Sequence, residues 1–351
     1  MRRKTRVVKI GNIYIGGKNP IAIQSMAKTK TADIEKTIQQ IKQLQAVGCQ
    51  IVRLAIKDSQ DARAIKKIKA EIKIPLVADI HFHWGLALEA IDQGADKIRL
   101  NPGNIHKDHE IREIISALKL AKIPLRIGVN SGSVKDLNSR RLNMSERLVA
   151  SALDYIRIIE KMRFYDLVIS LKASGVRDTV EAYRKISKLC AYPLHLGVTA
   201  TGLTLQGAVK SSLAIGTLLL EGIGDTIRIS LTDKPQEEVK VAKYILEALD
   251  LRHFGPQVIS CPTCGRCTVD LVKIVRQLEN KLASGYWQLA TGATKLAVMG
   301  CVVNGPGEAK EADLGLAFGK KQGLLFKKGR IIKKVSQLNC IPSLLKEINI
   351  K

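Results

Sequence analysis

The chain has 351 residues, 46% of them hydrophobic and 25% charged, which is the composition of a soluble globular protein with enough length for two domains. Its formal net charge of +25 would suit nucleic acid, but aromatic residues make up only 4% and no RNA-binding or zinc-finger motif occurs, so we expect no nucleic-acid partner. No signal peptide follows Met1, and the most apolar segment, 213–220, is too short to cross a bilayer. We therefore expect a cytoplasmic protein with no membrane partner, in which segment 213–220 is a buried helix.

From about residue 20 to residue 232 the sequence repeats one unit, a short apolar or β-branched run followed by a helical pattern such as 31–45 or 146–161. Prolines at 75, 124 and 193 open strands, where a missing N–H is tolerated. Eight such units predict a (β/α)8 TIM-type barrel rather than a doubly wound sheet, and no glycine-rich dinucleotide motif follows the first strand. The predicted strands are 21–26, 51–56, 75–80, 97–101, 124–130, 166–172, 193–199 and 226–231.

A helix at 235–251 completes the predicted barrel domain, residues 1–253, and a linker lies at 252–256. The remainder, 254–351, predicts a smaller α/β domain. Its helix, 269–283, carries four apolar side chains on one face, and strands are predicted on both sides of it. The four apolar residues are Leu271, Val275, Leu278 and Leu282, and the strands are 257–260, 295–299, 314–318 and 324–327.

Cationic side chains recur near the ends of the barrel strands, where barrel enzymes assemble their active sites. A single strand arginine is usually a satisfied ion pair, but too few acidic residues share these positions to neutralise Arg53, Arg99, Arg126, Lys172 and Arg228. Because a guanidinium group binds phosphate oxygens bidentately, the pattern predicts an anion such as a diphosphate. Polar residues at the same strand ends are Asp79, His81, Asn101, Asn130, Thr199 and Ser230.

Asp79, His81 and His83 would share one face of an extended strand, an arrangement that can bind a divalent metal ion. Hydrogen bonding to a polar substrate uses the same residues, so both interpretations stay open.

Four of the seven cysteines are grouped: Cys261, Cys264 and Cys267 form two C-x2-C steps, and Cys301 follows Gly300. In a reducing compartment such spacing predicts metal ligation, with an iron–sulfur cluster favoured. A structural zinc ribbon is the alternative, although a ribbon commonly pairs two C-x2-C knuckles and Cys301 has no neighbouring cysteine. Spacing alone selects Cys267 as the fourth ligand.

Seven motifs, in order along the whole chain, are similar to those of the 4-hydroxy-3-methylbut-2-enyl diphosphate synthase family in its short bacterial form. They are QSM at 24–26, VADIHF at 77–82, RLNPGN at 99–104, RIGVN at 126–130, EGIGDT at 221–226, CPTC at 261–264 and GCVVNGPGE at 300–308.

The resemblance implies a [4Fe-4S] cluster held by Cys261, Cys264, Cys301 and Glu308, with Cys267 left out. It implies two-electron reductive ring opening and dehydration of 2-C-methyl-D-erythritol 2,4-cyclodiphosphate to 4-hydroxy-3-methylbut-2-enyl diphosphate, a step of the methylerythritol phosphate route to isoprenoids. The implied catalytic residues are Glu308, His81 and Asn130. The implied substrate-binding residues are Arg53, Asp79, Arg99, Asn101, Arg126, Lys172, Thr199, Arg228 and Ser230.

The resemblance also implies electron supply from reduced flavodoxin or ferredoxin, acidic proteins that a +25 surface would attract. It further implies a homodimer in which the cluster domain of one subunit caps the barrel of the other.

One departure concerns the run after the seventh strand, where the family usually has a glutamate that serves as a catalytic acid and this chain has Ala200. Loss of a general acid costs roughly 10²–10⁴-fold in rate. Either water or His81 delivers protons instead, or the chain is a low-activity or non-catalytic iron–sulfur regulatory protein on the same fold. A third hypothesis is a barrel of the related pteroate-synthase type with a structural zinc.

Overall fold

A computed structural model describes residues 2–134, 142–283, 294–301, 312–319 and 322–348. The chain divides into two compact units, Met1–Arg252 and His253–Lys351. Within the described ranges, no helix is both long and apolar enough to span a membrane.

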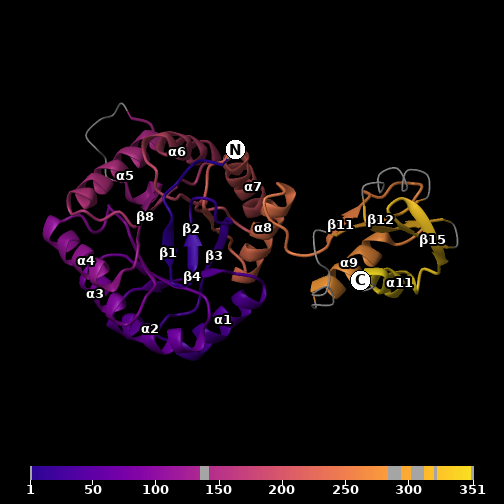
Figure 1. The fold of residues 1–351 in the computed structure, drawn as a ribbon, viewed down its shortest axis with the longest axis horizontal. Coiled ribbons are helices and arrows are strands. Elements are labelled where there is room, and N and C mark those ends of the chain that lie inside the picture. Colours follow the sequence, from indigo (N-terminus) through magenta and orange to yellow (C-terminus); the bar gives the residue numbers. More distant parts are fainter. Residues whose placement is uncertain (1, 135–141, 284–293, 302–311, 320–321, 349–351) are drawn as a thin grey trace. The chain divides into compact units, whose positions relative to one another are not determined.

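The first unit is a parallel barrel surrounded by helices α1 to α8 (Figure 1). Its eight strands are bonded in the order β8-β7-β6-β5-β4-β3-β10-β9, and a parallel bridge between Ile169 and Leu194 joins the two ends of the sheet. The predicted (β/α)8 barrel is therefore confirmed. Its strands are β3 (Ala22–Met26), β4 (Ile51–Ile56), β5 (Leu76–Ile80), β6 (Lys97–Leu100), β7 (Leu125–Asn130), β8 (Leu167–Lys172), β9 (His195–Leu196) and β10 (Thr226–Ile227).

Three of the barrel helices, α1, α2 and α5, begin at polar caps whose side chains accept hydrogen bonds from backbone N–H groups of the first turn. Asn143 forms a capping box with Glu146, and the Asp58 carboxylate accepts hydrogen bonds from two backbone N–H groups of the next helix. Each helix then buries one apolar stripe against the strands. The helices are α1 (Ile34–Ala46), α2 (Ser59–Glu71), α3 (Gly85–Asp92), α4 (Asp108–Ala121), α5 (Met144–Lys161), α6 (Val176–Leu189), α7 (Thr204–Leu220) and α8 (Pro235–Ala248).

Helix α7 corrects the expectation that segment 213–220 is a buried helix. Its inner stripe is buried, but Leu213 is 58% exposed and Leu220 is 75% exposed. A helix on the outside of a barrel has only one face against the strands, so the apolar residues on its other face remain in solvent.

A short antiparallel hairpin, β1 (Val8–Ile10) and β2 (Ile13–Ile15), closes the N-terminal end of the barrel. Val8, Ile10 and Ile15 pack against the inward-facing side chains Ala22, Ile51, Val77 and Val168 near the starts of four strands. This hairpin was not predicted from the sequence. It gives the barrel interior an apolar floor, above which the polar side chains lie.

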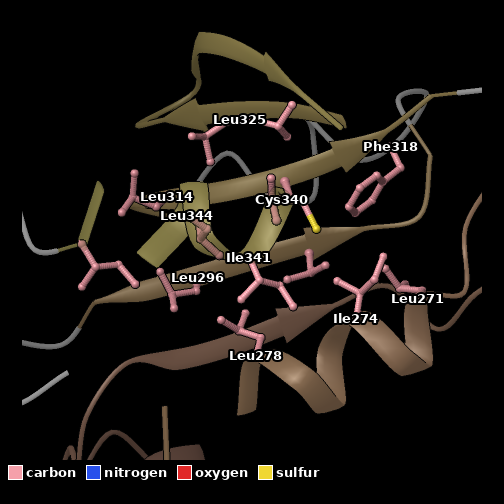
Figure 2. Close-up of a cluster of buried hydrophobic side chains, with 14 of the residues drawn as sticks. Leu271, Ile274, Leu278, Leu296, Leu314, Phe318, Leu325, Cys340, Ile341 and Leu344 are labelled. Atoms are coloured by element: carbon pink, nitrogen blue, oxygen red, sulfur yellow. The ribbon is translucent and has the colours of Figure 1, made fainter. Parts of the chain in front are cut away.

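The second unit is a five-stranded sheet with the order β11-β12-β13-β14-β15, parallel over its first three strands and antiparallel over the rest. Helices α9 and α11 bury their apolar stripes against it, and leucine and isoleucine side chains fill the space between (Figure 2). Cys340, outside the group of four cysteines, begins α11 and is buried in this core. The elements are β11 (Gln257–Ser260), α9 (Leu271–Ala283), β12 (Lys295–Met299), β13 (Leu314–Phe318), β14 (Gly323–Lys327), β15 (Arg330–Val335) and α11 (Cys340–Ile348).

Candidate functional site

The barrel interior contains a network centred on Asp79 of β5. One carboxylate oxygen accepts a hydrogen bond from Arg99 Nη1 at 2.9 Å, and the other lies 3.5 Å from Arg53 Nε. Burial alone would raise the pKa of Asp79, but the charges of Arg53 and Arg99 outweigh it and hold that pKa well below its usual range. Asp79 therefore stays ionised and fixes both guanidinium groups.

Arg126 spans the barrel. Its Nη1 donates to Gln24 Oε1 at 2.8 Å, and β7 and β3, which carry these residues, lie four strands apart in the sheet order. Only 1% of Arg126 is exposed, and its Nη2 has no hydrogen-bond partner among the described residues. Burial and the charges of Arg53 and Arg99 lower its pKa. One face of this guanidinium is therefore available to a ligand.

Two inward-facing glycines make room for cations. A Cβ atom on Gly197 would lie 2.7 Å from Lys172 Nζ and 2.8 Å from the Arg228 carbonyl oxygen. A Cβ atom on Gly128 would overlap the guanidinium of Arg99, whose Nη2 donates to the Gly128 carbonyl oxygen at 2.9 Å. The absence of a side chain at these positions lets long cationic side chains reach the centre of the barrel.

Glu238 of α8 organises the opposite side of the network. Its Oε1 lies 3.1 Å from Arg228 Nη2 and 3.2 Å from Lys28 Nζ, and its Oε2 accepts from Ser25 Oγ at 3.0 Å. Arg228 Nη1 also donates to Ser230 Oγ at 2.5 Å. Glu238 is 1% exposed and was not predicted as a site residue, because its contact with Arg228 joins a helix to a strand and leaves no local sequence pattern.

The interior carries more positive than negative charge. Among the described side chains, the carboxylates that pair with its cations are those of Asp79 and Glu238. Burying cations without counter-charges is unfavourable, so the arrangement favours binding of an anion. The cations are Arg53, Lys97, Arg99, Arg126, Lys172 and Arg228.

Four further candidates lie at the C-terminal ends of the strands. His81 is 42% exposed and its Nε2 lies 3.6 Å from Asp79 Oδ2, while Asn101 donates to Ser133 Oγ at 2.8 Å. With its amide group turned, Asn130 Oδ1 accepts from Arg99 Nη2 at 3.1 Å. Thr199 is half-buried where the chain leaves β9.

The metal interpretation of Asp79, His81 and His83 is not supported. His83 is exposed and its ring lies against the Gly85 backbone. In the part of the chain that the structure describes, no three His, Cys, Asp or Glu side chains form a group that would hold a metal ion. Asp79 and His81 therefore act as hydrogen-bonding groups.

The cysteines lie at the ends of two neighbouring parallel strands of the second unit. Cys261 directly follows β11, and Cys301 lies two residues beyond β12, whose Val298 pairs with Ser260. The Gly300 N–H donates to Cys261 Sγ at 3.3 Å, and Cys264 is exposed. Cysteine sulfurs and a backbone N–H directed at one of them are the donor types of an iron–sulfur site, although the described cysteines do not gather three around one point in this structure. Glu308 lies outside the described residues.

Cys267 shares its packing with Cys261, since both lie against the same apolar core, and differs in its hydrogen bond. Its Sγ donates to the Val269 carbonyl oxygen at 3.2 Å and packs against the apolar core beneath α9. A Cβ atom on Gly300 would overlap this sulfur, so the close packing depends on glycine. These contacts favour a structural role for Cys267.

Sequence reasoning missed Gln24, Lys97, His195 and Glu238 as site residues. Strand alternation carried the signal for two of them, since Lys97 lies two residues before Arg99 and His195 two residues before Gly197, on the same face. Both are fully buried.

Comparison with solved structures shows the fold of the barrel. The dihydropteroate synthase of Stenotrophomonas maltophilia, with imidazole bound in its active site, matches with a TM-score of 0.53 and 12% identity, over 70% of this chain and 98% of that one. An N-acetylneuraminic acid synthetase of Leptospira borgpetersenii matches with a TM-score of 0.50 and 11% identity, over 81% of this chain and 99% of that one. At such identities the likeness extends to the fold alone.

Sequence comparison is more specific. The model of the GcpE TIM-barrel domain matches residues 5–243, and that of the GcpE protein C-terminal domain matches residues 257–350. A 4-hydroxy-3-methylbut-2-en-1-yl diphosphate synthase (flavodoxin) of Fusobacterium nucleatum is 53% identical over 99% of this chain and 98% of its own length. The enzyme of the same name from Caldanaerobacter subterraneus is 52% identical over 99% of this chain and 97% of its own length. The resemblance seen in the sequence is thus confirmed, and the chain belongs to the GcpE family together with these synthases.

Proposed function

We propose that this protein is an iron–sulfur oxidoreductase that converts 2-C-methyl-D-erythritol 2,4-cyclodiphosphate to 4-hydroxy-3-methylbut-2-enyl diphosphate in isoprenoid biosynthesis. Written for the neutral acids, the substrate takes up two electrons and two protons and yields the product and one water. The observation that carries the proposal is the barrel interior, whose cations outnumber their paired carboxylates and therefore suit a diphosphate.

The barrel residues bind and orient the substrate. Arg126 and Lys172 face the centre with little competition from carboxylates, so they contact the diphosphate oxygens, with Arg228 and Ser230 beside them. Asp79 holds Arg53 and Arg99 in fixed positions before substrate arrives, which reduces the cost of ordering them on binding. Asn101, Asn130 and Thr199, at the strand ends, would direct the hydroxyl groups of the substrate.

The cysteines of the second unit would hold a [4Fe-4S] cluster, with Cys261, Cys264 and Cys301 as thiolate ligands and Glu308 as the fourth. Such a cluster supplies the electrons and an iron site for the departing oxygen. The contacts of Cys267 with Val269 and the core support leaving it out of this set.

We assign proton delivery to His81, since Ala200 replaces the glutamate that relatives of this family usually carry. His81 lies at the strand ends, partly exposed, with its Nε2 3.6 Å from Asp79 Oδ2, where an imidazole can reach both substrate and solvent. His81→Gln should lower kcat by about 10²-fold or more. Ala200→Glu in the His81→Gln background should restore part of the loss. If His81→Gln turns over at the wild-type rate, another proton donor operates.

The electron donor is proposed to be reduced flavodoxin or ferredoxin. These carriers are acidic, and a net charge of +25 speeds their encounter with this protein at low salt. Free thiols throughout the chain suit a reducing compartment, so we place the reaction in the cytoplasm.

We further propose a homodimer that uses the outer face of α7. Leu205, Val209, Leu213 and Leu220 repeat at helical spacing on this face and are between 53% and 79% exposed. In a chain of charge +25, a second copy is best accommodated at a face with few charges, and Lys210 is the single charged residue of α7. Leu213→Glu should shift the mass measured by light scattering from dimer to monomer. An unchanged mass would place the interface elsewhere.

The proposed function is tested by anaerobic iron and sulfide quantification together with turnover of the cyclodiphosphate under a strong reductant. We expect about four irons and four sulfides per chain, and conversion of substrate to product. A correctly reconstituted cluster with no turnover would contradict the catalytic assignment. Zinc in place of iron would support the pteroate-synthase-type hypothesis, whose barrel likeness is one of fold alone.

The relatives give no support to a non-catalytic regulatory protein on the same fold. Full-length proteins with 50–53% identity are named as synthases, and their alignments span 97–99% of their own length. Ala200 is therefore a change within an enzyme site.

A further inference from the structure

Lys97 is a buried lysine for which the reaction just described has no use. It opens β6 and faces the barrel interior, because Arg99 two residues later lies on the same face and bonds Asp79. Lys97 has no exposed surface, and its Nζ has no hydrogen-bond partner within the described ranges. A lysine in this state is rare, since burial of an unpaired ammonium is strongly unfavourable.

The surroundings of Lys97 supply donors rather than acceptors. The side-chain nitrogens Gln24 Nε2 and Arg126 Nη2 are also buried and without a described partner. Below them, Val77 and Val168 belong to the apolar floor sealed by the β1–β2 hairpin. His195 Nε2, also buried and without a described partner, can accept one hydrogen bond when the ring is neutral, so acceptors for the remaining donors would come from a bound molecule or from solvent.

The charged side chains near Lys97 do not provide it with a counter-charge. Arg126 of β7 and Arg53 of β4 repel its charge, and Asp79 of β5 is already paired with Arg53 and Arg99. His195 of β9 is fully buried, and its Nδ1 bonds Thr226 Oγ1 at 2.7 Å. Burial first, and then the charges of Arg126, Lys172 and Lys97, lower the pKa of His195 well below its usual range, so that it stays neutral.

Burial first, and then the charges of Arg126 and Arg53, lower the pKa of Lys97 well below its ordinary value. An anion placed against Arg126 would offset these charges and favour the ammonium form. Proton uptake and anion binding are then linked, and affinity falls as pH rises between the pKa of the free site and that of the occupied site. Lys172 lies in the same field, and burial and its cationic neighbours lower its pKa as well.

We propose that Lys97 is a further binding residue of the diphosphate site, whose buried and unpartnered Nζ, on the strand beside that of Arg126, contacts the anion. The inference rests on the proposed function, since it takes the ligand of the barrel to be a diphosphate.

The test uses the holoprotein and inorganic pyrophosphate as probe. Calorimetric titrations at several pH values, in two buffers of different ionisation enthalpy, give both the affinity and the protons taken up on binding. Lys97→Met keeps the length and apolar stem of the side chain and removes the charge. Lys66→Met, on the exposed side of α2, is the matched control.

We expect wild-type protein and Lys66→Met to take up protons on binding pyrophosphate. Lys97→Met should take up fewer, bind about 10–100-fold more weakly at neutral pH, and show a shallower loss of affinity with rising pH. Its urea midpoint without ligand should equal or exceed that of the wild type, because a buried amine without a hydrogen-bond partner has been replaced by an apolar group.

Equal affinity and equal proton uptake in Lys97→Met and wild type would overturn the inference and leave the proposed function intact. So would a lower urea midpoint or failure of Lys97→Met to fold, since either indicates a structural role. A wild type that binds no pyrophosphate would count against the diphosphate site itself, and the inference would fail with it.

Discussion

The two units use their interiors in opposite ways. The barrel encloses charged side chains inside a ring of strands, and only its floor, beside the β1–β2 hairpin, is apolar. The core of the second unit is apolar throughout the described residues (Figure 2), and Cys261 and Cys301 follow the ends of two strands. A closed barrel has a second apolar layer between strands and helices, so its interior is not needed for the hydrophobic core. An open sheet of five strands has no such spare interior.

The difference indicates how closely the function of each site is coupled to the stability of its unit. In the barrel, the anion site is part of the interior, so binding and folding energetics are coupled through charges such as Asp79. In the second unit the core only positions the strands, so the cysteines are replaceable without loss of the fold. Five predictions test this contrast.

The largest expected effect is on the cluster. Cys261→Ser removes a thiol directly after β11 and should abolish iron binding and turnover, while the circular-dichroism spectrum changes little because the substitution is nearly isosteric and Cys261 is only partly buried against the core. Cys267→Ser should retain iron, with stability reduced by about 1 kcal/mol through the packing that sulfur provides. Iron analysis of the two variants decides this. Loss of iron in Cys267→Ser with retention in Cys261→Ser would reverse the ligand assignment.

Asp79→Asn should give the largest loss of stability in the barrel. It leaves Arg53 and Arg99 buried without their counter-charge, a change that costs about 3–5 kcal/mol. Urea denaturation without ligand measures this cost. Added pyrophosphate should return part of it, because the anion supplies the missing charge.

The same carboxylate fixes the acid side of the stability profile. The pKa of Asp79 is lower in the folded than in the unfolded protein, so its contribution is present at neutral pH and is lost as pH falls below about 4. The difference in unfolding free energy between wild type and Asp79→Asn should therefore shrink in acid. A difference that stays constant down to pH 2 would mean that the ion pairs contribute nothing.

Gly197→Ala should weaken substrate binding and also lower stability, since the new methyl group would lie 2.8 Å from the Arg228 carbonyl oxygen. The new methyl group would lie 2.7 Å from Lys172 Nζ and must displace it, and a shift of about 1 Å at a positioned group costs about 10²-fold. Gly216→Ala, in the buried part of α7 where a Cβ atom meets nothing within 4 Å, is the matched control and should leave pyrophosphate affinity unchanged. Equal affinities in the two variants would show that Lys172 does not contact the anion.

Much of this architecture could be predicted from the sequence. The strands at 51–56, 257–260, 295–299 and 314–318 have the same bounds in the structure, because their apolar runs end at sharp polar or glycine boundaries. The cationic strand ends were also predicted, since they recur at equivalent positions. The strands β9 and β10 were predicted too long. Regular strand pairing extends only over His195–Leu196 and Thr226–Ile227, and the polar residues that follow are not paired as strand.

The remainder depended on contacts between distant residues. Glu238 belongs to a helix, and only the folded chain brings it to Arg228. The hairpin at the floor has strands of three residues, too short for a periodic pattern to be distinctive. Lys97 is the first residue of the predicted strand 97–101, so the sequence alone indicated a strand boundary at this position and not a site residue. Its burial depends on Arg126, which crosses the barrel from the next strand, and no local pattern reveals that.

The smallest expected effect tests whether the apolar core of the second unit influences iron content or anion binding in addition to stability. Ile274, on the inner face of α9, is 4% exposed and lies in the apolar core (Figure 2). Ile274→Val removes one methylene group and should lower the unfolding free energy by about 0.5–1.5 kcal/mol. Iron content and pyrophosphate affinity should both stay at wild-type values, since the substitution changes neither the cysteines nor the barrel charges. A drop in pyrophosphate affinity would show that the two interiors are energetically coupled, and the contrast between them would then need revision.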